Sequence, residues 1–235
     1  MPEAVGEGAF SRSAAMLGDA AMRRLADARV LVVGAGGVGS WCAEALVRTG
    51  VGHLAVMDDD VVAVSNLNRQ CPATAESVGR RKVDAMRERL LAVNPSCDVA
   101  ALAVRFTGAE DIAGFDAVVD AIDSVDCKAA LIMKASELGI YVVSSMGAAL
   151  RTDPTKVRVS RFDKVVGDGL ARALRRRFRA GGRNPPRFEC VWSEEPPRDC
   201  AERGSLMQVT ATFGMCLAAR VIDKVLGLTN GFVRG

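Results

Sequence analysis

Histidine is scarce in the sequence and paired cysteines are missing, which excludes several kinds of catalysis. The one histidine, His53, lies in a strand-like stretch, so serine–histidine or cysteine–histidine chemistry would depend on a single poorly placed side chain. The seven cysteines form no CxxC pair, which excludes a zinc ribbon and a thioredoxin-like redox motif. We therefore expect no zinc site, and we expect most cysteines to be small buried apolar side chains.

Long apolar runs and a secretory leader are absent as well. No apolar run approaches the roughly 20 residues that a membrane-spanning helix needs. Residues 1–8 lack the basic start and the apolar stretch of a secretory signal. These absences predict a cytoplasmic protein with no membrane segment.

The 235 residues suit one large domain, or a domain with an appendage, and their 49% hydrophobic content is ample for a buried core. Strand-like runs and helical spacings alternate as far as Gly147, as in βαβ units. Strands are expected at 29–34, 53–57, 99–104, 115–121, 140–144, 156–162 and 187–193. Helices are expected at 40–49, 77–93, 128–138, 165–180 and 205–226. The pattern predicts an α/β fold, a doubly wound Rossmann-like, mostly parallel sheet with an appended C-terminal α+β portion.

A glycine-rich turn follows the first expected strand. Its pattern is GxGxxG, made by Gly34, Gly36 and Gly39 with a further glycine at Gly37. Glycines here let a nucleotide approach the backbone, and the next helix presents unsatisfied N–H groups. Asp58, at the end of the second strand, is placed to accept hydrogen bonds from ribose hydroxyls. The pattern predicts a nucleotide site, although NAD dehydrogenases share it.

The segment that follows favours ATP over a dinucleotide. Residues 58–60 (DDD) lead into residues 65–70 (SNLNRQ), and Lys82 lies in the next expected helix. A nicotinamide pocket needs apolar walls and has little use for these cations. An ATP enzyme needs Arg69 and Lys82 to hold the phosphates and to offset the charge of an adenylation transition state.

These motifs resemble those of the ThiF/MoeB/HesA adenylating enzymes, relatives of the ubiquitin-activating enzymes. The matching pieces are 34–40 (GAGGVGS), 58–60, 65–70, Lys82 and 120–124 (DAIDS). The resemblance implies an enzyme that binds ATP with magnesium through Gly34, Gly36, Gly37, Gly39, Asp58, Asp60, Asn66, Arg69, Lys82 and Asp123. In that family the counterpart of Asp58 binds ribose, and those of Arg69 and Lys82 contact the phosphates. The counterpart of Asp123 supports the magnesium ion.

The resemblance also implies a homodimer. Residues 10–13 (FSRS) resemble the family's N-terminal motif, whose arginine reaches into the ATP site of the partner subunit. Arg12 would then join Arg69, Lys82 and Asp123 as a catalytic residue. Ala9 stands where the motif often has a second arginine.

Within the family, the sequence more closely resembles the zinc-free branch that dehydrates threonylcarbamoyladenosine in tRNA. Segments typical of that branch are 36–41, 45–50, 120–124, 128–132, 153–155, 190–194 and 209–214. The resemblance implies ligase-like chemistry, in which ATP adenylates the threonylcarbamoyl carboxylate and the neighbouring ureido group closes a ring, expelling AMP. Two alternatives stay open. One is adenylation of the C-terminal glycine of a ubiquitin-like sulfur-carrier protein, and the other is a non-catalytic nucleotide-binding scaffold.

Segment 164–187 contains eight basic residues against a single acid, Asp168. Such a run is a solvated helix face or a surface for a polyanion, and tRNA is the partner that we expect. A sulfur-transfer protein is a possible further partner. A catalytic thiol at Cys190 or Cys200 is a lesser alternative to a packing role.

We expect three parts along the chain. Residues 1–9 form a flexible N-terminus, and residues 10–150 an ATP-binding, Rossmann-like adenylation domain. Residues 151–235 form a C-terminal extension packed on the same domain, with a basic helix, a mobile loop at 194–204 and a closing helix.

Overall fold

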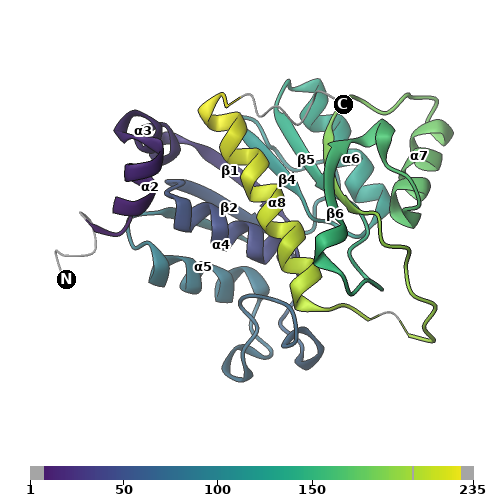
Figure 1. Cartoon of the computed structure of the whole chain (residues 1–235), viewed down its shortest axis with the longest axis horizontal. Coiled ribbons are helices and arrows are strands. Elements are labelled where there is room, and N and C mark those ends of the chain that lie inside the picture. The colour runs from purple at the N-terminus through teal and green to yellow at the C-terminus, as the bar shows by residue number, and fades with distance from the viewer. Residues whose placement is uncertain (1–7, 203, 229–235) are drawn as a thin grey trace.

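The computed structural model, which describes residues 8–202 and 204–228, centres on one seven-stranded sheet (Figure 1). The strand order is β3-β2-β1-β4-β5-β7-β6. These strands are β1 (Arg29–Val33), β2 (His53–Met57), β3 (Asp98–Leu102), β4 (Ala117–Asp120), β5 (Tyr141–Ser145), β6 (Val157–Arg161) and β7 (Glu189–Ser193). All neighbouring strands are parallel except β6, which pairs antiparallel with β7. The predicted α/β, mostly parallel fold is confirmed.

Helices cover both faces of this sheet. They are α2 (Ser11–Leu17), α3 (Asp19–Asp27), α4 (Gly39–Thr49), α5 (Lys82–Val93), α6 (Val125–Glu137), α7 (Gly169–Ala180) and α8 (Met207–Leu226). Alternate residues of β1 point to opposite faces, as a strand requires. Val30 and Val32 join the core with α4, α5 and α8, whereas Leu31 and Val33 join the core with α6 and α7. The sheet is therefore buried on both sides, as its apolar strands predict.

Helix α8 lies diagonally across one face of the sheet, next to α4 (Figure 1). Gly214 allows this close approach, because a Cβ there would lie 2.6 Å from the carbonyl oxygen of Val38. The contact brings the C-terminal helix over the glycine turn that precedes α4. Strands β6 and β7 likewise extend the same sheet, so both parts of the chain on either side of residue 150 contribute to one core. None of the described helices is long and apolar enough to cross a membrane.

The segment between β2 and α5 projects from the lower edge of the molecule in Figure 1. The sequence predicts a helix from residue 77, but α5 begins at Lys82. Thr74 and Ser77 cap each other in a short 3-10 turn, and Gly79 then takes a left-handed φ of 86°. Arg81 next pairs with Val61 in a short antiparallel bridge. The chain therefore turns back before it becomes helical, which places Lys82 at the first residue of α5.

Helix α7 and the segment before β1 also differ from the expected pattern. Helix α7 begins at Gly169 instead of near residue 165, because the carboxylate of Asp168 accepts the Ala171 N–H at 2.8 Å and caps the helix. Helices α2 and α3, which precede β1, were not expected, and Arg12 lies on α2. Most of the N-terminal segment predicted to be flexible falls outside the described residues.

Candidate active site

A pocket of about 490 Å³ opens at the carboxyl ends of β1, β2 and β4. Strand order reverses between β1 and β4, which is where doubly wound sheets bind ligands. Nine of the residues predicted from the sequence line this pocket, namely Gly34, Gly36, Gly37, Asp58, Asp60, Asn66, Arg69, Lys82 and Asp123. The remaining two, Gly39 and Arg12, are not among its lining residues.

The glycine turn forms the floor of the pocket. Gly34 has a φ of 98°, and a Cβ there would lie 2.6 Å from the carbonyl oxygen of Ala121 at the end of β4. Gly36 faces open space, with no atom closer than 4.0 Å to the position of a Cβ. Gly39 is needed for packing instead, since a Cβ there would come within 1.8 Å of the carbonyl oxygen of Gly34. The turn thus leaves room for a ligand directly above its backbone.

Asp58 is held in place by its own backbone surroundings. One carboxylate oxygen accepts the N–H of Ala35 at 2.7 Å, and the other accepts the N–H of Asp60 at 2.9 Å. Its side chain is 11% exposed. Each carboxylate oxygen has two lone pairs, so the oriented Asp58 can still accept hydrogen bonds from ligand hydroxyls.

Lys82 brings a positive charge to the same wall. Its Nζ donates to Oδ2 of Asp60 at 2.7 Å and lies 3.8 Å from Oδ1 of Asp58. The lysine side chain is 8% exposed, whereas that of Asp60 is 60% exposed. Asn66, also buried, closes its own turn by accepting the N–H of Ala63 at 3.0 Å. Acidic and basic side chains therefore lie next to each other on this wall of the pocket.

Within the described residues, the Arg69 guanidinium hydrogen-bonds only to its own segment. Its Nη1 donates to the carbonyl oxygen of Ser65 at 2.8 Å and to Oδ1 of Asn68 at 2.9 Å. Among the described residues, its other guanidinium N–H groups have no hydrogen-bond acceptor. These groups remain available to a phosphate.

Asp123 follows β4 and is exposed at the pocket. Within the described part of the chain its carboxylate makes no hydrogen bond or ion pair. The loop that holds it is anchored from beneath, because Oδ1 of Asp120 accepts the N–H of Ile122 at 3.1 Å. A carboxylate with no protein partner at this position is suited to an external cation.

A buried cluster below this loop was not predicted as part of the site. Lys128 and Asp120 form an ion pair at 2.6 Å, and both side chains are fully buried. Lys128 also donates to the carbonyl oxygen of Ser145 at 2.9 Å, and Ser144 donates to Asp120 at 2.5 Å. The cluster ties the end of β4 to the end of β5. Lys128 lies in a segment that the sequence identifies as typical of the branch, but nothing in that segment indicates burial.

A further part of the pocket wall comes from later segments, which the sequence did not link to the site. It consists of residues 145–149, Leu170, Ser205 and Thr210. Arg151 supports this wall from a buried position, donating to the carbonyl oxygen of Gly147 at 2.6 Å and pairing with Asp168 at 3.2 Å. The segment 209–214, which contains Thr210, was singled out only as typical of the branch, with no indication that it approaches the site.

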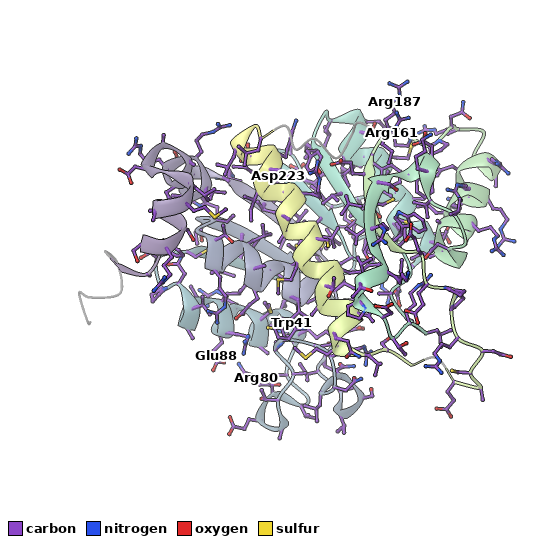
Figure 2. The ribbon with its side chains drawn as sticks, in the orientation of Figure 1. Trp41, Arg80, Glu88, Arg161, Arg187 and Asp223 are labelled. Atoms are coloured by element: carbon purple, nitrogen blue, oxygen red, sulfur yellow. The ribbon has the colours of Figure 1, made fainter. Side chains whose placement is uncertain are left out.

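The basic segment 164–187 leads away from the pocket. Leu170, in the first turn of α7, lines the pocket, whereas Arg187 lies at the upper edge of the molecule in Figure 2, away from Trp41 in the lower half. Arg177 pairs with Asp126, and Arg183 pairs with Glu137 at 2.8 Å. The exposed members with no acidic partner among the described residues are Lys164, Arg172, Arg176, Arg179 and Arg187.

The two cysteines considered as catalytic differ in their surroundings. Cys190 is fully buried in β7, and burial raises the pKa of its thiol to about 12. It is therefore protonated at neutral pH and unsuited to nucleophilic attack. Cys200 is exposed and is not among the residues that line the pocket.

Comparisons with known proteins identify the family of this chain. A family model described as the ThiF family matches residues 10–234. The tRNA threonylcarbamoyladenosine dehydratase of Escherichia coli is 36% identical, over 92% of this chain and 93% of that protein. The crystal structure of the E. coli enzyme in complex with ATP superposes with a TM-score of 0.88 and covers 93% of this chain and 94% of its own.

A relative with lower identity is named as an adenylyltransferase of a sulfur carrier protein. The sulfur carrier protein adenylyltransferase of Thermus thermophilus is 32% identical, over 90% of this chain and 74% of that protein. Because the family model spans nearly the whole chain and the E. coli relative matches it almost from end to end, the chain belongs to the ThiF family.

Proposed function

We propose that this protein is an ATP-dependent enzyme that dehydrates threonylcarbamoyladenosine in tRNA to a cyclic product, through adenylation of the substrate carboxylate. The observation that carries the proposal is the single pocket that gathers Asp58, Arg69, Lys82 and Asp123. The identity with the E. coli dehydratase over nearly the full length of both chains supports it.

In the proposed reaction, a carboxylate oxygen of the threonylcarbamoyl group attacks the α-phosphorus of ATP and pyrophosphate leaves. The neighbouring ureido group then attacks the activated carbonyl, so that AMP leaves and a ring closes. Asp58 would hold the ribose hydroxyls, while Arg69 and Lys82 would offset the negative charge on the phosphates. Both nucleophiles belong to the substrate, so the protein needs no catalytic thiol or imidazole. Positioning and charge stabilisation are its contributions.

The residues present fit a magnesium ion delivered with ATP. Magnesium prefers carboxylate, phosphate and water oxygens. Asp123 offers a carboxylate with no partner among the described residues, whereas Asp58 and Asp60 are engaged with backbone N–H groups or Lys82. Asp123 would therefore hold the ion, which when bound neutralises phosphate charge.

The proposed surface for tRNA is the basic segment 164–187. Its helix α7 buries Ala171, Leu174 and Phe178 and turns Arg172, Arg176 and Arg179 outward. These three arginines have helical spacing, so they form one row that begins close to the pocket. Such a row can follow a phosphate backbone toward the reacting nucleoside.

Arg12 completes the proposal as a residue supplied by a second copy of the chain. It is exposed on α2 and does not line its own pocket, so a catalytic role requires a homodimer. We propose such a dimer in the cytoplasm, with a sulfur-transfer protein as a further possible partner. We also propose that the chain divides at residue 150 into an adenylation domain and a C-terminal extension packed on it.

The test is nucleoside mass analysis of bulk tRNA after incubation with the purified protein, ATP and magnesium. We expect threonylcarbamoyladenosine to lose one water only when ATP is present. Arg69→Ala should lower the rate at least about 100-fold, because it removes charge stabilisation in the transition state. Arg80→Ala is the matched control, since Arg80 lies near the site but forms an exposed pair with Glu88.

The second candidate is adenylation of the C-terminal glycine of a sulfur-carrier protein, which the identity with the Thermus thermophilus enzyme favours. The absence of CxxC pairs argues against it. Unchanged tRNA, together with pyrophosphate release that requires a carrier protein, would support this candidate and refute the dehydratase.

A further inference from the structure

The first turn of α4 contacts the segment that carries Arg69. Trp41 donates its indole N–H to the carbonyl oxygen of Arg69 at 2.9 Å. In Figure 2, Trp41 lies beside the lower end of α8, where the segment between β2 and α5 leaves the body of the molecule. The bond joins residues 28 positions apart in sequence, so it fixes the projecting segment against the helix that follows the glycine turn.

Ser40 makes a second connection between the same two segments. Its hydroxyl donates to the carbonyl oxygen of Gly36 at 2.6 Å and accepts the N–H of Cys71 at 3.1 Å. Ser40 is fully buried. One side chain thereby links the glycine turn to the residue two positions after Arg69.

Glu44 makes the third connection, one helical turn further along α4. Its buried carboxylate pairs with Arg89 at 2.9 Å and accepts the thiol of Cys71 at 3.6 Å. Burial, with Glu44 adding to it, raises the pKa of Cys71 to about 12. The thiol therefore keeps the proton that it donates to Glu44.

The position of the Arg69 guanidinium depends on these connections. Among the described residues, its only hydrogen bonds, with Ser65 and Asn68, lie within its own segment and move with it. The Arg69 side chain passes above Gly37, where a Cβ would lie 3.1 Å from its Cγ. A shift of the Arg69 peptide would therefore change the distance between its guanidinium and the glycine turn.

We propose that Trp41 is a positioning residue, whose indole N–H holds Arg69 over the glycine turn in register for the phosphates of ATP. The inference rests on the proposed function only in taking ATP as the ligand of this pocket. It assigns Trp41 no contact with ATP, because Trp41 is not among the residues that line the pocket.

Direct titration of ATP against Trp41→Phe tests the proposal. Phenylalanine keeps an aromatic ring but lacks the N–H donor, so the hydrogen bond to the Arg69 carbonyl is removed while an aromatic side chain stays in place. We expect the ATP dissociation constant to rise about fivefold, the effect of one hydrogen bond of ordinary strength. In an Arg69→Ala background, the same Trp41→Phe change should alter ATP binding less than about twofold, because the backbone acceptor remains but the guanidinium that the bond positions is gone.

The chain supplies a matched control in its other tryptophan. Trp192 donates its indole N–H to Oγ of Ser160 at 2.9 Å, on the β6–β7 edge of the sheet. Trp192→Phe removes the same kind of bond and should leave the affinity for ATP unchanged. Thermal melts of both variants show whether their stabilities are comparable.

The outcomes separate cleanly. The proposal is overturned if Trp41→Phe binds ATP as the wild type does, or if it weakens binding equally with and without Arg69. An equal loss of ATP affinity in Trp192→Phe would overturn the proposal as well, since removing any indole N–H would then weaken ATP binding. A wild type that binds no ATP would refute the proposed function itself. Dehydration of tRNA is measured in a separate assay, so failure of the proposed function can be told apart from failure of this inference.

Discussion

Lys128 and Asp120 form an ion pair at 2.6 Å with neither side chain exposed to solvent. The pair lies directly below the loop that carries Asp123, and Asp120 also accepts the N–H of Ile122 in that loop. Burying two charges is costly unless each is fully hydrogen-bonded, and here Ser144 and the carbonyl of Ser145 complete the set. The pair thus links the stability of the fold to the position of the candidate metal ligand.

Replacing one partner of this pair should strongly destabilise the fold. Lys128→Met leaves Asp120 buried and uncompensated, so the free energy of unfolding should fall by about 3–5 kcal/mol, as urea denaturation can measure. Adding Asp120→Asn should restore part of the loss, because the amide oxygen can still accept the N–H of Ile122. Arg183→Ala breaks an exposed pair and should cost less than about 1 kcal/mol. If Lys128→Met and Arg183→Ala lowered the free energy of unfolding equally, this view of the buried pair would be contradicted.

The outward row on α7 should determine how salt affects tRNA binding. Arg176→Ala or Arg179→Ala should each reduce the slope of log affinity against log salt by about one, since each removes one phosphate contact. Binding of ATP should not change. Arg23→Ala on α3, also exposed, is the control and should leave the slope as it is. Filter-binding titrations over a range of salt concentrations measure the slopes, and unaltered slopes in both α7 variants would exclude this surface.

Mixing two inactive variants tests whether Arg12 acts across a dimer. If it does, dimers of Arg12→Ala with Arg69→Ala have one site with both arginines. Random mixing should then recover up to about a quarter of the wild-type rate, because half of the dimers each have one intact site. Mixing Arg69→Ala with Lys82→Ala should recover nothing, since both residues line the same pocket of one chain. No recovery in the first mixture would place Arg12 outside the partner's site.

Buried thiols should make the fold less stable at alkaline pH. Burial raises the pKa of Cys190 to about 12 and that of Cys97 to about 11, from 9.0 in the unfolded chain. Below about pH 9 both states keep these protons. Above it only the unfolded state releases them, so the free energy of unfolding falls as the pH rises toward about 11. Urea denaturation in reductant at about pH 8 and about pH 10 measures the fall.

A comparison of cysteine variants identifies which thiols cause this loss of stability at alkaline pH. Cys190→Ala should lessen the dependence on pH, whereas Cys200→Ala should not, because Cys200 is exposed. The account of buried thiols would be wrong if both variants kept the full dependence.

The residues of the site that could be predicted from sequence are those whose roles are set locally. Gly34 and Asp58 lie at the ends of consecutive parallel strands, and such strand ends meet at one edge of a sheet whatever the rest of the chain does. Lys82 and Arg69 were found because their segments resemble known motifs. The Arg69 guanidinium contacts its own segment and Asp58 accepts the N–H of Ala35 after the adjoining strand, whereas Lys82, 22 positions from Asp60, was found through its motif alone.

The parts of the site and fold that the sequence did not predict depend on contacts between different segments of the chain. Nothing around Arg151 indicates that it would be buried against Asp168, and nothing around Leu170 indicates a place in the pocket wall. The start of α5 was missed because Gly79, in a left-handed conformation, ends the preceding turn, whereas the sequence pattern by itself allows a helix from Ser77. Such pairings are set by packing, to which local propensity is a weak guide.

The central claim is that the substrate carboxylate is adenylated before the ring closes. It is tested most directly with tRNA whose threonylcarbamoyl carboxylate contains heavy oxygen. An oxygen of that carboxylate would become bonded to the α-phosphorus and leave with AMP. Mass analysis of the nucleotide products should therefore find one heavy oxygen in AMP, and none in pyrophosphate. Heavy oxygen that appears in orthophosphate, with ADP as the nucleotide product, would contradict adenylation and indicate phosphorylation of the carboxylate instead.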